Sequence, residues 1–278
     1  MPEKPPTSDT VSRRRLALCC AFAPVAALAS CATPAPLPAG AAAVLAPSGR
    51  LRACINLGNP ILANRDSRGV GSGVSVDMAT LLAQRIGVPL DLVVVDAALK
   101  SVDTVKADLA DIGFFAIDPL RSDGIGFTAP YVLIEGAYLV RRDSPFTDNA
   151  QVDRAGTRIM VGRGSAYDLY LSRELKAAQL LRTPTSQTVV ERFLAENADV
   201  AAGVRQQLES DAARLGGLRL LPGRFMVIDQ AMGLPLTRGA DATSMLASFV
   251  EQAKSSGYVA QSLLRHDIRG AIVAPVSS

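Results

Sequence analysis

Two long stretches decide how this chain folds: YVLIEGAYLVRR at residues 131–142 and FMVIDQAMGLP at residues 225–235. Both have the composition of extended strands, and each is about twice as long as an average strand. A compact single α/β domain rarely contains such strands, so we expect both to cross between two lobes. The predicted first lobe consists of residues 49–138 plus 236–275. The predicted second lobe covers residues 139–235, with the crossover strands as hinges at its ends.

The rest of the sequence alternates short β-branched runs with segments whose apolar residues lie on one helical face. This alternation predicts an α/β fold with mainly parallel strands, which bind ligands at the carboxyl ends of those strands. The remaining strands are expected at residues 50–57, 90–95, 111–116, 157–161, 179–182, 198–203 and 218–221. Helices are expected at residues 75–86, 97–107, 165–178, 186–196, 204–214, 241–255 and 258–266.

The composition excludes a disordered chain and a nucleic-acid-binding tail. Of the 278 residues, 49% are hydrophobic and 20% are charged, which allows an ample core. The formal net charge is +3, but residues 1–30 hold four basic and two acidic side chains. Subtracting their +2 leaves about +1 for the remaining chain, so a dominant electrostatic partner such as DNA is not expected.

The N-terminus has the pattern of an export signal. A basic segment, Ser12–Arg15, precedes an uncharged apolar run at residues 16–30, which is short for a membrane span. We therefore predict a signal peptide at residues 1–30. Its end, Leu28-Ala29-Ser30-Cys31, resembles a bacterial lipobox, so Cys31 is the expected lipid acceptor; a plainly cleaved signal is the alternative. Residues 31–48 are rich in Pro and Ala and are expected to tether the domain to the membrane.

The export route stays open between the Sec pathway and the twin-arginine pathway, because the arginines at 13–15 loosely resemble the twin-arginine signal. The expected location is the periplasm, as a membrane-anchored lipoprotein. The sequence does not distinguish anchoring in the inner membrane from anchoring in the outer one.

Cysteine and histidine usage gives no support for metal or redox chemistry. Beyond the predicted lipobox the only cysteine is Cys54, which lies in an apolar strand pattern and is expected in the core, with a nucleophile as the alternative. The single histidine, His266, lies in a helical stretch near the C-terminus. We predict no cofactor and no metal site.

Two features could hold an anionic ligand. Arg121 follows a strand end and a Pro turn, where a planar guanidinium can bind a carboxylate with two parallel hydrogen bonds; a surface Arg paired with Asp118 or Asp123 is the alternative. Gly164-Ser165 precedes the helix expected at 165–178, whose free N–H groups can bind an anion. The alternative there is an ordinary turn with Ser165 as helix cap.

Several motifs of this sequence together resemble those of a known protein family. Gly73–Met78 resembles the signature of bacterial extracellular solute-binding proteins of family 3, the polar amino-acid receptors of ABC importers. Asp111–Ala116, then Asp118–Arg121, then Phe127–Tyr131 resemble the family's strand, anchoring Arg and segment before the hinge, and Gly164-Ser165 resembles its second-lobe helix start. The resemblance covers most of the chain after the signal.

This resemblance implies a type II periplasmic binding protein: two α/β lobes that close on a small solute. It assigns the ligand's carboxylate to Arg121 and to the helix start at Ser165. It also implies an ABC permease in the inner membrane as partner, a small carboxylate-bearing ligand such as an amino acid or related organic acid, and no enzymatic activity. We further expect a monomer without nucleic-acid partners.

The sequence departs from the family where an amino acid's other groups would bind. Ala116 replaces the Ser or Thr that helps hold the carboxylate, and Val204 follows the strand where an acid normally pairs with the ligand's ammonium. Asn59 stands where an aromatic residue usually stacks on the ligand, and Asn56 where an acid is often found. A standard zwitterionic amino acid is therefore not assured, and a small carboxylate with neutral partners is favoured.

The phenylalanines before Ala116 supply an apolar wall in this interpretation, and strand alternation suggests that only one of them lines the cleft. The full set of predicted ligand-binding residues is Arg121, Ser165, Gly164, Ala166, Phe114, Phe115, Ala116, Asn56, Asn59 and Val204.

Two other functions remain open from sequence. Periplasmic cyclohexadienyl dehydratases resemble this family and use carboxylates in the cleft; here Glu135 at the predicted hinge and Asp118 near Arg121 are acid/base candidates. Glu135 is equally interpretable as a hinge residue. A solute sensor without a transport role is the second alternative, because it would use the same cleft.

Overall fold

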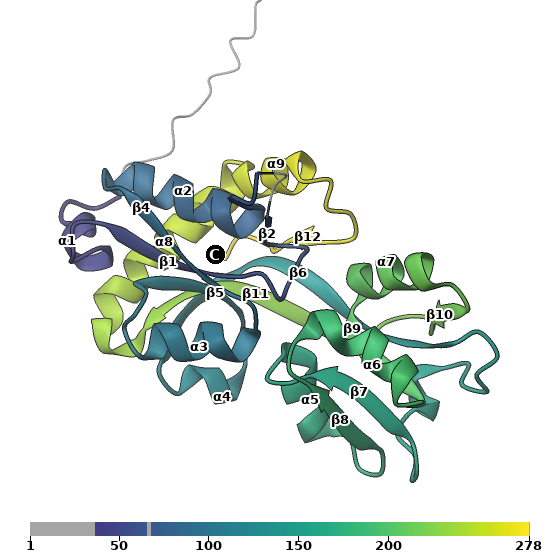
Figure 1. Ribbon diagram of the computed structural model, residues 1–278. Helices are drawn as coiled ribbons and strands as arrows, with labels where there is room; N and C mark the ends of the chain where they lie inside the picture. Colours follow the sequence, from purple (N-terminus) through teal and green to yellow (C-terminus); the bar gives the residue numbers. More distant parts are fainter. Residues whose placement is uncertain (1–36, 66–67, 278) are drawn as a thin grey trace, which may run out of the picture. The chain divides into compact units, whose positions relative to one another are not determined.

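The structure, a computed structural model, describes residues 37–65 and 68–277. Both long stretches are strands: β6 (Ile125–Arg141) and β11 (Met226–Pro235). They pair antiparallel along most of β11, and each continues from one group of strands to the other (Figure 1). β6 begins six residues before the expected run, because the segment after Arg121 is already extended and pairs with the end of β11.

The sheet order is β4-β1-β5-β11-β6-β9-β7-β8, with β10 and β12 also paired to β6. On one side of the crossover pair, β1 is parallel to β4 and β5; on the other side, β7 is parallel to β8 and β9. The other strands are β1 (Leu51–Asn56), β2 (Asn64–Arg65), β3 (Gly71–Ser72), β4 (Leu90–Val95), β5 (Ile112–Ala116), β7 (Arg158–Gly162), β8 (Gln179–Thr183), β9 (Val200–Val204), β10 (Leu218–Leu220) and β12 (Ile272–Val273).

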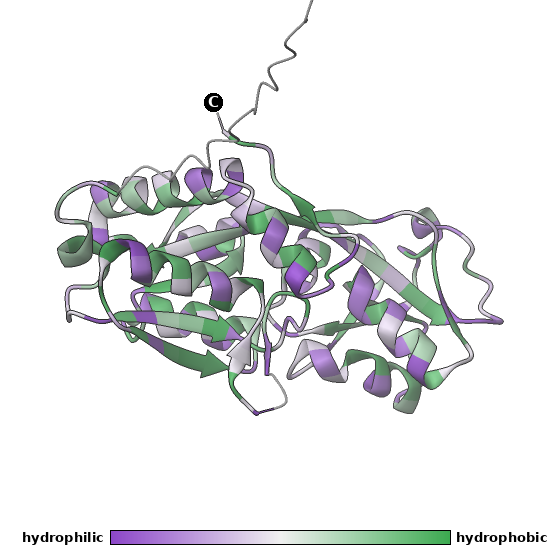
Figure 2. Cartoon of the chain, turned by 90° about the horizontal axis from the view of Figure 1, so that it is seen from above, coloured by the Kyte–Doolittle hydropathy of each residue, from purple (hydrophilic) through white to green (hydrophobic). Residues whose placement is uncertain are grey.

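We call the part built on β1–β5 the first lobe and the part built on β7–β10 the second lobe. Helices pack on both parts, and hydrophilic and hydrophobic residues alternate along them (Figure 2). The first lobe has α1 (Ala41–Leu45), α2 (Val74–Ile86), α3 (Ala98–Lys106), α4 (Pro119–Ser122), η3 (Leu236–Arg238), α8 (Gly239–Ser255) and α9 (Tyr258–Arg265). The second lobe has η1 (Asn149–Gln151), α5 (Ala166–Glu174), η2 (Ser186–Thr188), α6 (Val189–Ala195) and α7 (Arg205–Leu215).

The two-lobed α/β architecture with two crossover strands is as predicted. The lobe boundaries stay a prediction, because the lobes contact each other and the described residues form one compact unit. None of the helices in the described ranges combines the length and apolar character needed to cross a membrane. The predicted signal peptide at 1–30 and the lipid acceptor Cys31 lie outside the described residues.

The structure differs from the expected tether at the tether's C-terminal end. Residues 41–45 form helix α1, with Ala41 and Leu45 buried, and the following Ala46 is also buried. Alanine has the highest helix propensity, and Leu45 gives this short helix an apolar contact with the main core. The end of the predicted tether is therefore part of the folded unit.

Most other elements lie within two residues of their predicted ends. The helix expected at 75–86 ends as predicted: Gly87 adopts the left-handed conformation at φ 72°, which closes a helix most easily with glycine. The helix expected at 186–196 is instead a 3-10 turn, η2, followed by α6. The helix expected at 165–178 is shorter, because its last turn gives way to an extended residue at Leu175.

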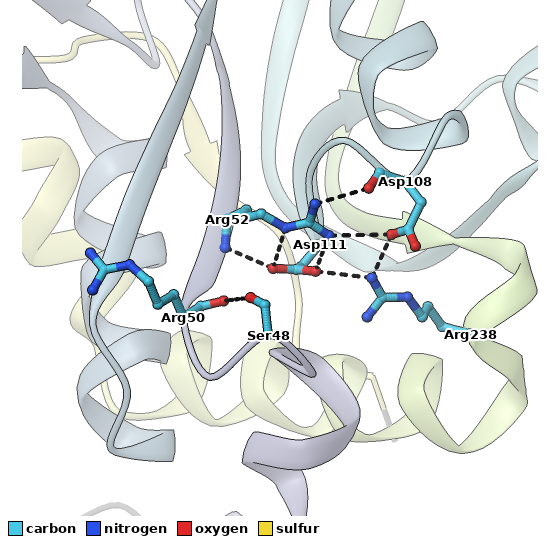
Figure 3. Close-up of polar contacts among 6 residues, drawn as sticks. All are labelled: Ser48, Arg50, Arg52, Asp108, Asp111 and Arg238. Atoms are coloured by element: carbon cyan, nitrogen blue, oxygen red, sulfur yellow. Dashed lines mark hydrogen bonds and ion pairs between the residues drawn. The ribbon is translucent and has the colours of Figure 1, made fainter.

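A buried carboxylate, that of Asp111, joins two arginines of the first lobe (Figure 3). Asp111, at the start of β5, has a fully buried side chain and accepts hydrogen bonds from the Arg52 guanidinium and backbone and from Arg238. The closest Arg52–Asp111 and Arg238–Asp111 distances are 2.7 Å and 2.9 Å. Burial by itself raises the pKa of Asp111, but these hydrogen bonds outweigh it and hold the pKa below its usual value.

Candidate functional site

One cavity lies where strands of both lobes end. Its volume, measured as the space open to the centre of a water-sized sphere, is about 50 Å³. This is several times the volume that one water needs, so the cavity can hold a small ligand. Residues from both lobes and from the crossover strand β11 line it: Asn56, Gly58, Asn59, Leu62, Ser75, Ala98, Ser101, Phe114, Phe115, Ala116, Arg121, Ser165, Ala166, Tyr167, Ser186, Val204, Gln207, Ile228 and Gln230.

The local fold after β5 aims Arg121 into this cavity. The strand ends at Ala116, and Asp118 then caps the short helix α4 by accepting a hydrogen bond from the Leu120 N–H at 3.0 Å. Pro119 suits the first helical position, where no N–H is needed. One helical turn later Arg121 lies back against the strand end, and only 5% of its surface is exposed. It is therefore not the surface Arg of the alternative interpretation.

The Arg121 guanidinium contacts both lobes. It donates from Nη1 to the Ala116 carbonyl at 2.9 Å and from Nη2 to the Gly164 carbonyl at 2.8 Å. Burial lowers the pKa of Arg121 to about 10, although the negative charge of Asp118 opposes this, so the group stays protonated at neutral pH. Three of the five N–H groups of the guanidinium are left for other acceptors.

No acidic side chain in the described part of the chain forms an ion pair with Arg121. Its neighbour Asp118 is paired with Arg173 of helix α5 at 2.9 Å. Asp118 acts on Arg121 through its nearby charge, but no described carboxylate hydrogen-bonds this buried guanidinium, which makes the position favourable for an anionic ligand.

The second lobe contributes the start of helix α5. Gly164 takes the left-handed conformation at φ 67°, and Ser165 caps the helix by accepting a hydrogen bond from the Asp168 N–H at 3.1 Å. The next two residues, Ala166 and Tyr167, line the cavity, and their N–H groups lie in the first turn, where the helix offers no acceptor. This end of the helix is therefore suited to an anion.

The apolar wall comes from β5. The Phe114 ring meets Tyr131 edge-on and the Phe115 ring meets Phe127 edge-on, so the rings pack in separate clusters, as strand alternation requires. Both residues nevertheless line the cavity. The prediction from strand alternation, that only one of the two side chains faces the cleft, is consistent with the separate ring clusters, although both residues contribute to the cavity lining.

Neutral polar groups surround the rest of the space. The Asn56 side-chain oxygen accepts a hydrogen bond from the Gly58 N–H at 2.8 Å, while the buried Asn59 Oδ1 has no partner among the described residues. The buried Tyr167 hydroxyl lies near Ser186 without a hydrogen bond of good geometry to it. Burial also raises the pKa of Tyr167, which keeps that hydroxyl protonated.

The proposed acid/base candidates do not line the cavity. Glu135 forms ion pairs with Arg205 at 2.7 Å and Arg224 at 2.9 Å, and hydrogen bonds from Arg224 and Arg205 lower its pKa. This arrangement fixes Glu135 in the crossover strand as an ion-paired residue.

Metal-ligating side chains do not gather in the described residues: no group of three or more His, Cys, Asp or Glu could hold an ion there. His266 contacts Asp77 at 3.0 Å, and Cys54 is fully buried, with its Sγ 3.4 Å from the Ser101 hydroxyl. Burial raises the pKa of Cys54, which agrees with the core interpretation of this residue.

The structure brings the predicted residues together at this one cavity. All of them line it except Gly164, whose carbonyl instead binds Arg121. Sequence reasoning missed several polar lining residues, among them Ser75, Ser101 and Gln207. Gln230 is only 7% exposed, although it is one of two polar residues in crossover strand β11, and its alternation with the exposed Asp229 is what places it inward.

The chain belongs to the bacterial extracellular solute-binding proteins, family 3, whose family model matches residues 51–265. The matched range contains every residue of the cavity. A search of curated proteins finds no match.

Solved structures of the same fold include amino-acid receptors. The solute receptor for L-cysteine of Neisseria gonorrhoeae is 19% identical, with a TM-score of 0.71 over 83% of this chain and 94% of that one. A binding component of an ABC transporter from Wolinella succinogenes, complexed with lysine, is 21% identical, with a TM-score of 0.68 over 78% and 95%.

The fold also occurs in an ancestral amino acid-binding protein that is a precursor of cyclohexadienyl dehydratase. It is 15% identical, with a TM-score of 0.66 over 79% of this chain and 95% of that one. At these identities the likeness establishes the fold, and the ligand must be argued from the cavity.

Proposed function

We propose that this protein is the substrate-binding lipoprotein of an ABC importer and that it captures a small carboxylate-bearing solute, an amino acid or related organic acid, in the cavity between its lobes. The observation that carries the proposal is Arg121: a buried, protonated guanidinium that lines the cavity and has no acidic partner in the described residues. Family membership and the amino-acid ligands of the similar structures support the same class.

In this proposal the carboxylate binds between Arg121 and the first turn of helix α5. The guanidinium supplies charge-assisted hydrogen bonds, and the N–H groups of Ala166 and Tyr167 supply two further donors. The two groups belong to different lobes, so the ligand adds a bridge to the one that Arg121 and the Gly164 carbonyl already form. Binding would therefore stabilise the closed arrangement, and opening would release the solute to a permease.

The proposed setting is the periplasm, with a permease of the inner membrane as partner. The basic and apolar N-terminal sequence supports export, and Cys31 within its lipobox-like segment supports a lipid anchor. The described domain is proposed to act as a monomer.

The site geometry does not favour an enzyme. A dehydratase on this fold needs a carboxylate or another acid/base group next to its substrate. Glu135 and Asp118, the candidates from sequence, are each ion-paired to arginines, and neither lines the cavity. No second function is proposed.

The test is ligand binding by wild type and Arg121 variants. A thermal-shift screen of L-amino acids, 2-hydroxy acids and 2-oxo acids should give at least one hit, because a ligand that binds only the folded state raises the melting temperature. With that compound, Arg121→Ala should weaken binding by about 2–5 kcal/mol in calorimetry, since the buried carboxylate loses its charged partner.

Two further variants make the result specific. Arg121→Lys keeps the charge without the planar fork and should retain part of the affinity. Arg163→Ala removes an exposed arginine of the same β7–α5 loop and should leave binding unchanged. Equal affinity of wild type and folded Arg121→Ala for the hit would overturn the assignment.

A further inference from the structure

The formal charge of the cavity lining has a single sign, which is positive. Among the residues that line it, Arg121 alone carries a formal charge. Three acidic side chains close in sequence to lining residues do not line the cavity themselves: Asp118 pairs with Arg173, Asp168 accepts a hydrogen bond from the Gly164 N–H and pairs with Arg182, and Asp229 is exposed. The described lining of the cavity therefore offers one positive charge and no negative one.

We propose that the cavity selects small monocarboxylic acids that carry no ammonium group, such as 2-hydroxy or 2-oxo acids. This inference rests on the proposed function and narrows its ligand. One carboxylate beside Arg121 leaves the closed cavity electrically balanced. An amino acid would place its ammonium in the same space without an anionic partner, and a dicarboxylate would leave its second charge unpaired.

The neutral groups around the cavity suit a hydroxyl at both Asn59 and Asn56, and a carbonyl at the Asn56 amide nitrogen alone. Asn59 Oδ1 is a buried acceptor that no described residue hydrogen-bonds, and it can accept a hydrogen bond from a ligand hydroxyl. The Asn56 side-chain oxygen is occupied by the Gly58 N–H, so its amide nitrogen remains available as a donor. A hydroxyl group can donate to the first and accept from the second, which makes a polar pair without any charge.

The apolar lining limits the remainder of the ligand. Leu62, Phe114 and Ile228 line the cavity and suit a short aliphatic chain. The small accessible space, about 50 Å³, favours a compact ligand over one with a large side chain. A compact acid with one polar substituent next to its carboxylate matches these surfaces.

Val204 makes the selectivity testable. It lies at the end of β9, caps helix α7, lines the cavity and is 7% exposed. Val204→Asp would place a carboxylate in the cavity wall, and Val204→Asn would place a neutral group of similar size there. The two variants separate the effect of charge from that of shape.

The experiment is calorimetry with probe pairs that differ only in the group next to the carboxylate: L-lactate with L-alanine, and L-2-hydroxyisovalerate with L-valine, each supplemented by its 2-oxo acid. In wild type the hydroxy or oxo acid should bind at least about 100-fold more tightly than the amino acid. Val204→Asp should reduce or reverse this ratio, and Val204→Asn should keep it.

The outcomes separate this inference from the proposed function. If wild type binds the amino acids as tightly as their hydroxy partners, the selectivity is overturned while a carboxylate receptor stands. If Val204→Asp and Val204→Asn change the ratio equally, the charge argument is overturned. If no member of any pair binds, both the selectivity and the carboxylate assignment are overturned.

Discussion

At the residue scale, two buried charges have opposite surroundings. Asp111 is enclosed by two guanidinium groups, so its charge is satisfied within the fold. Arg121 is enclosed mainly by carbonyl groups and the cavity, so its charge is open to a ligand. The first residue is therefore expected to determine stability and the second to determine binding.

Asp111→Asn should destabilise the protein by about 3 kcal/mol, because it removes the buried carboxylate that both arginines contact. The measurement is the free energy of unfolding from urea titration near pH 7. Asp108→Asn is the matched control: Asp108 contacts the same two arginines, but 53% of its side chain is exposed, so its loss should cost less than about 1 kcal/mol. Equal losses in the two variants would contradict a dominant role for Asp111.

The stability of wild type and that of Asp111→Asn should depend differently on pH. The folded state lowers the pKa of Asp111, so the unfolded chain binds its proton more readily, and the stabilisation from Asp111 is present above the unfolded value of about 3.9. It is lost as the pH falls through the folded pKa. Unfolding measured from pH 6 to pH 3 should therefore show the gap between wild type and Asp111→Asn shrinking at the acidic end. A constant gap would contradict this coupling.

At the scale of elements, the turn between β7 and α5 positions the second lobe's part of the site. Gly164 is left-handed, and a Cβ there would lie 3.0 Å from the Leu99 Cβ of helix α3. Its carbonyl accepts the hydrogen bond from Arg121. The turn thus connects helix α5, which offers N–H groups to a ligand, with two elements of the first lobe.

Gly164→Ala should therefore affect both stability and binding. The left-handed conformation should cost about 1–2 kcal/mol of unfolding free energy, and the crowding against Leu99 should weaken ligand affinity several-fold by opposing closure. Gly156→Ala is the control, because Gly156 is also left-handed, at φ 87°, but its Cβ would meet nothing within 4 Å. It should lose similar stability and keep its affinity. A parallel loss of affinity in both variants would contradict the role of the Leu99 contact.

At the scale of the whole described unit, polar contacts hold the two lobes together without a ligand. Besides the Arg121–Gly164 bond, Asp118 pairs with Arg173 at 2.9 Å, and the Gln187 side chain donates to the Leu57 carbonyl at 2.9 Å. Each contact joins the first lobe to the second. Few such contacts separate the closed arrangement from an open one, which is consistent with a binding protein that must release its ligand.

Arg173→Met should shift the ligand-free protein toward an open arrangement. The change leaves the nearly buried Asp118 carboxylate without its partner in the closed form, at a cost of about 1 kcal/mol, because Arg173 is partly exposed. Small-angle scattering should show a larger radius of gyration, and affinity for the ligand should fall roughly fivefold.

The control for this variant is Arg192→Met, which removes an exposed arginine paired with Glu196 within helix α6 of the second lobe. It should leave both scattering and affinity unchanged. A radius of gyration for Arg173→Met that equals that of wild type would show that the ion pair does not support closure.

Much of the fold follows from local sequence. The crossover strands, the β-branched strand at 90–95 and the helix that ends at Gly87 were predictable, because their apolar periodicity and stop signals act over a few residues. Helix α1 was missed, because its five residues form a stable helix only when Leu45 is buried against the core.

The site residues likewise fall into those that local sequence predicted and those that only the folded structure revealed. Arg121, Ser165 and the residues around them could be named from motifs, since each follows a strand end or begins a helix. Sequence could not show that Asp118 pairs with Arg173 and Glu135 with Arg205, or that Gln207 and Gln230 face the cavity. These facts depend on contacts between residues far apart in the chain, and only the folded arrangement of the two lobes decides them. Local pattern thus determined the elements and the anchoring arginine. Tertiary packing decided which charges are neutralised, and it left that arginine as the one charged side chain among the described residues that line the cavity.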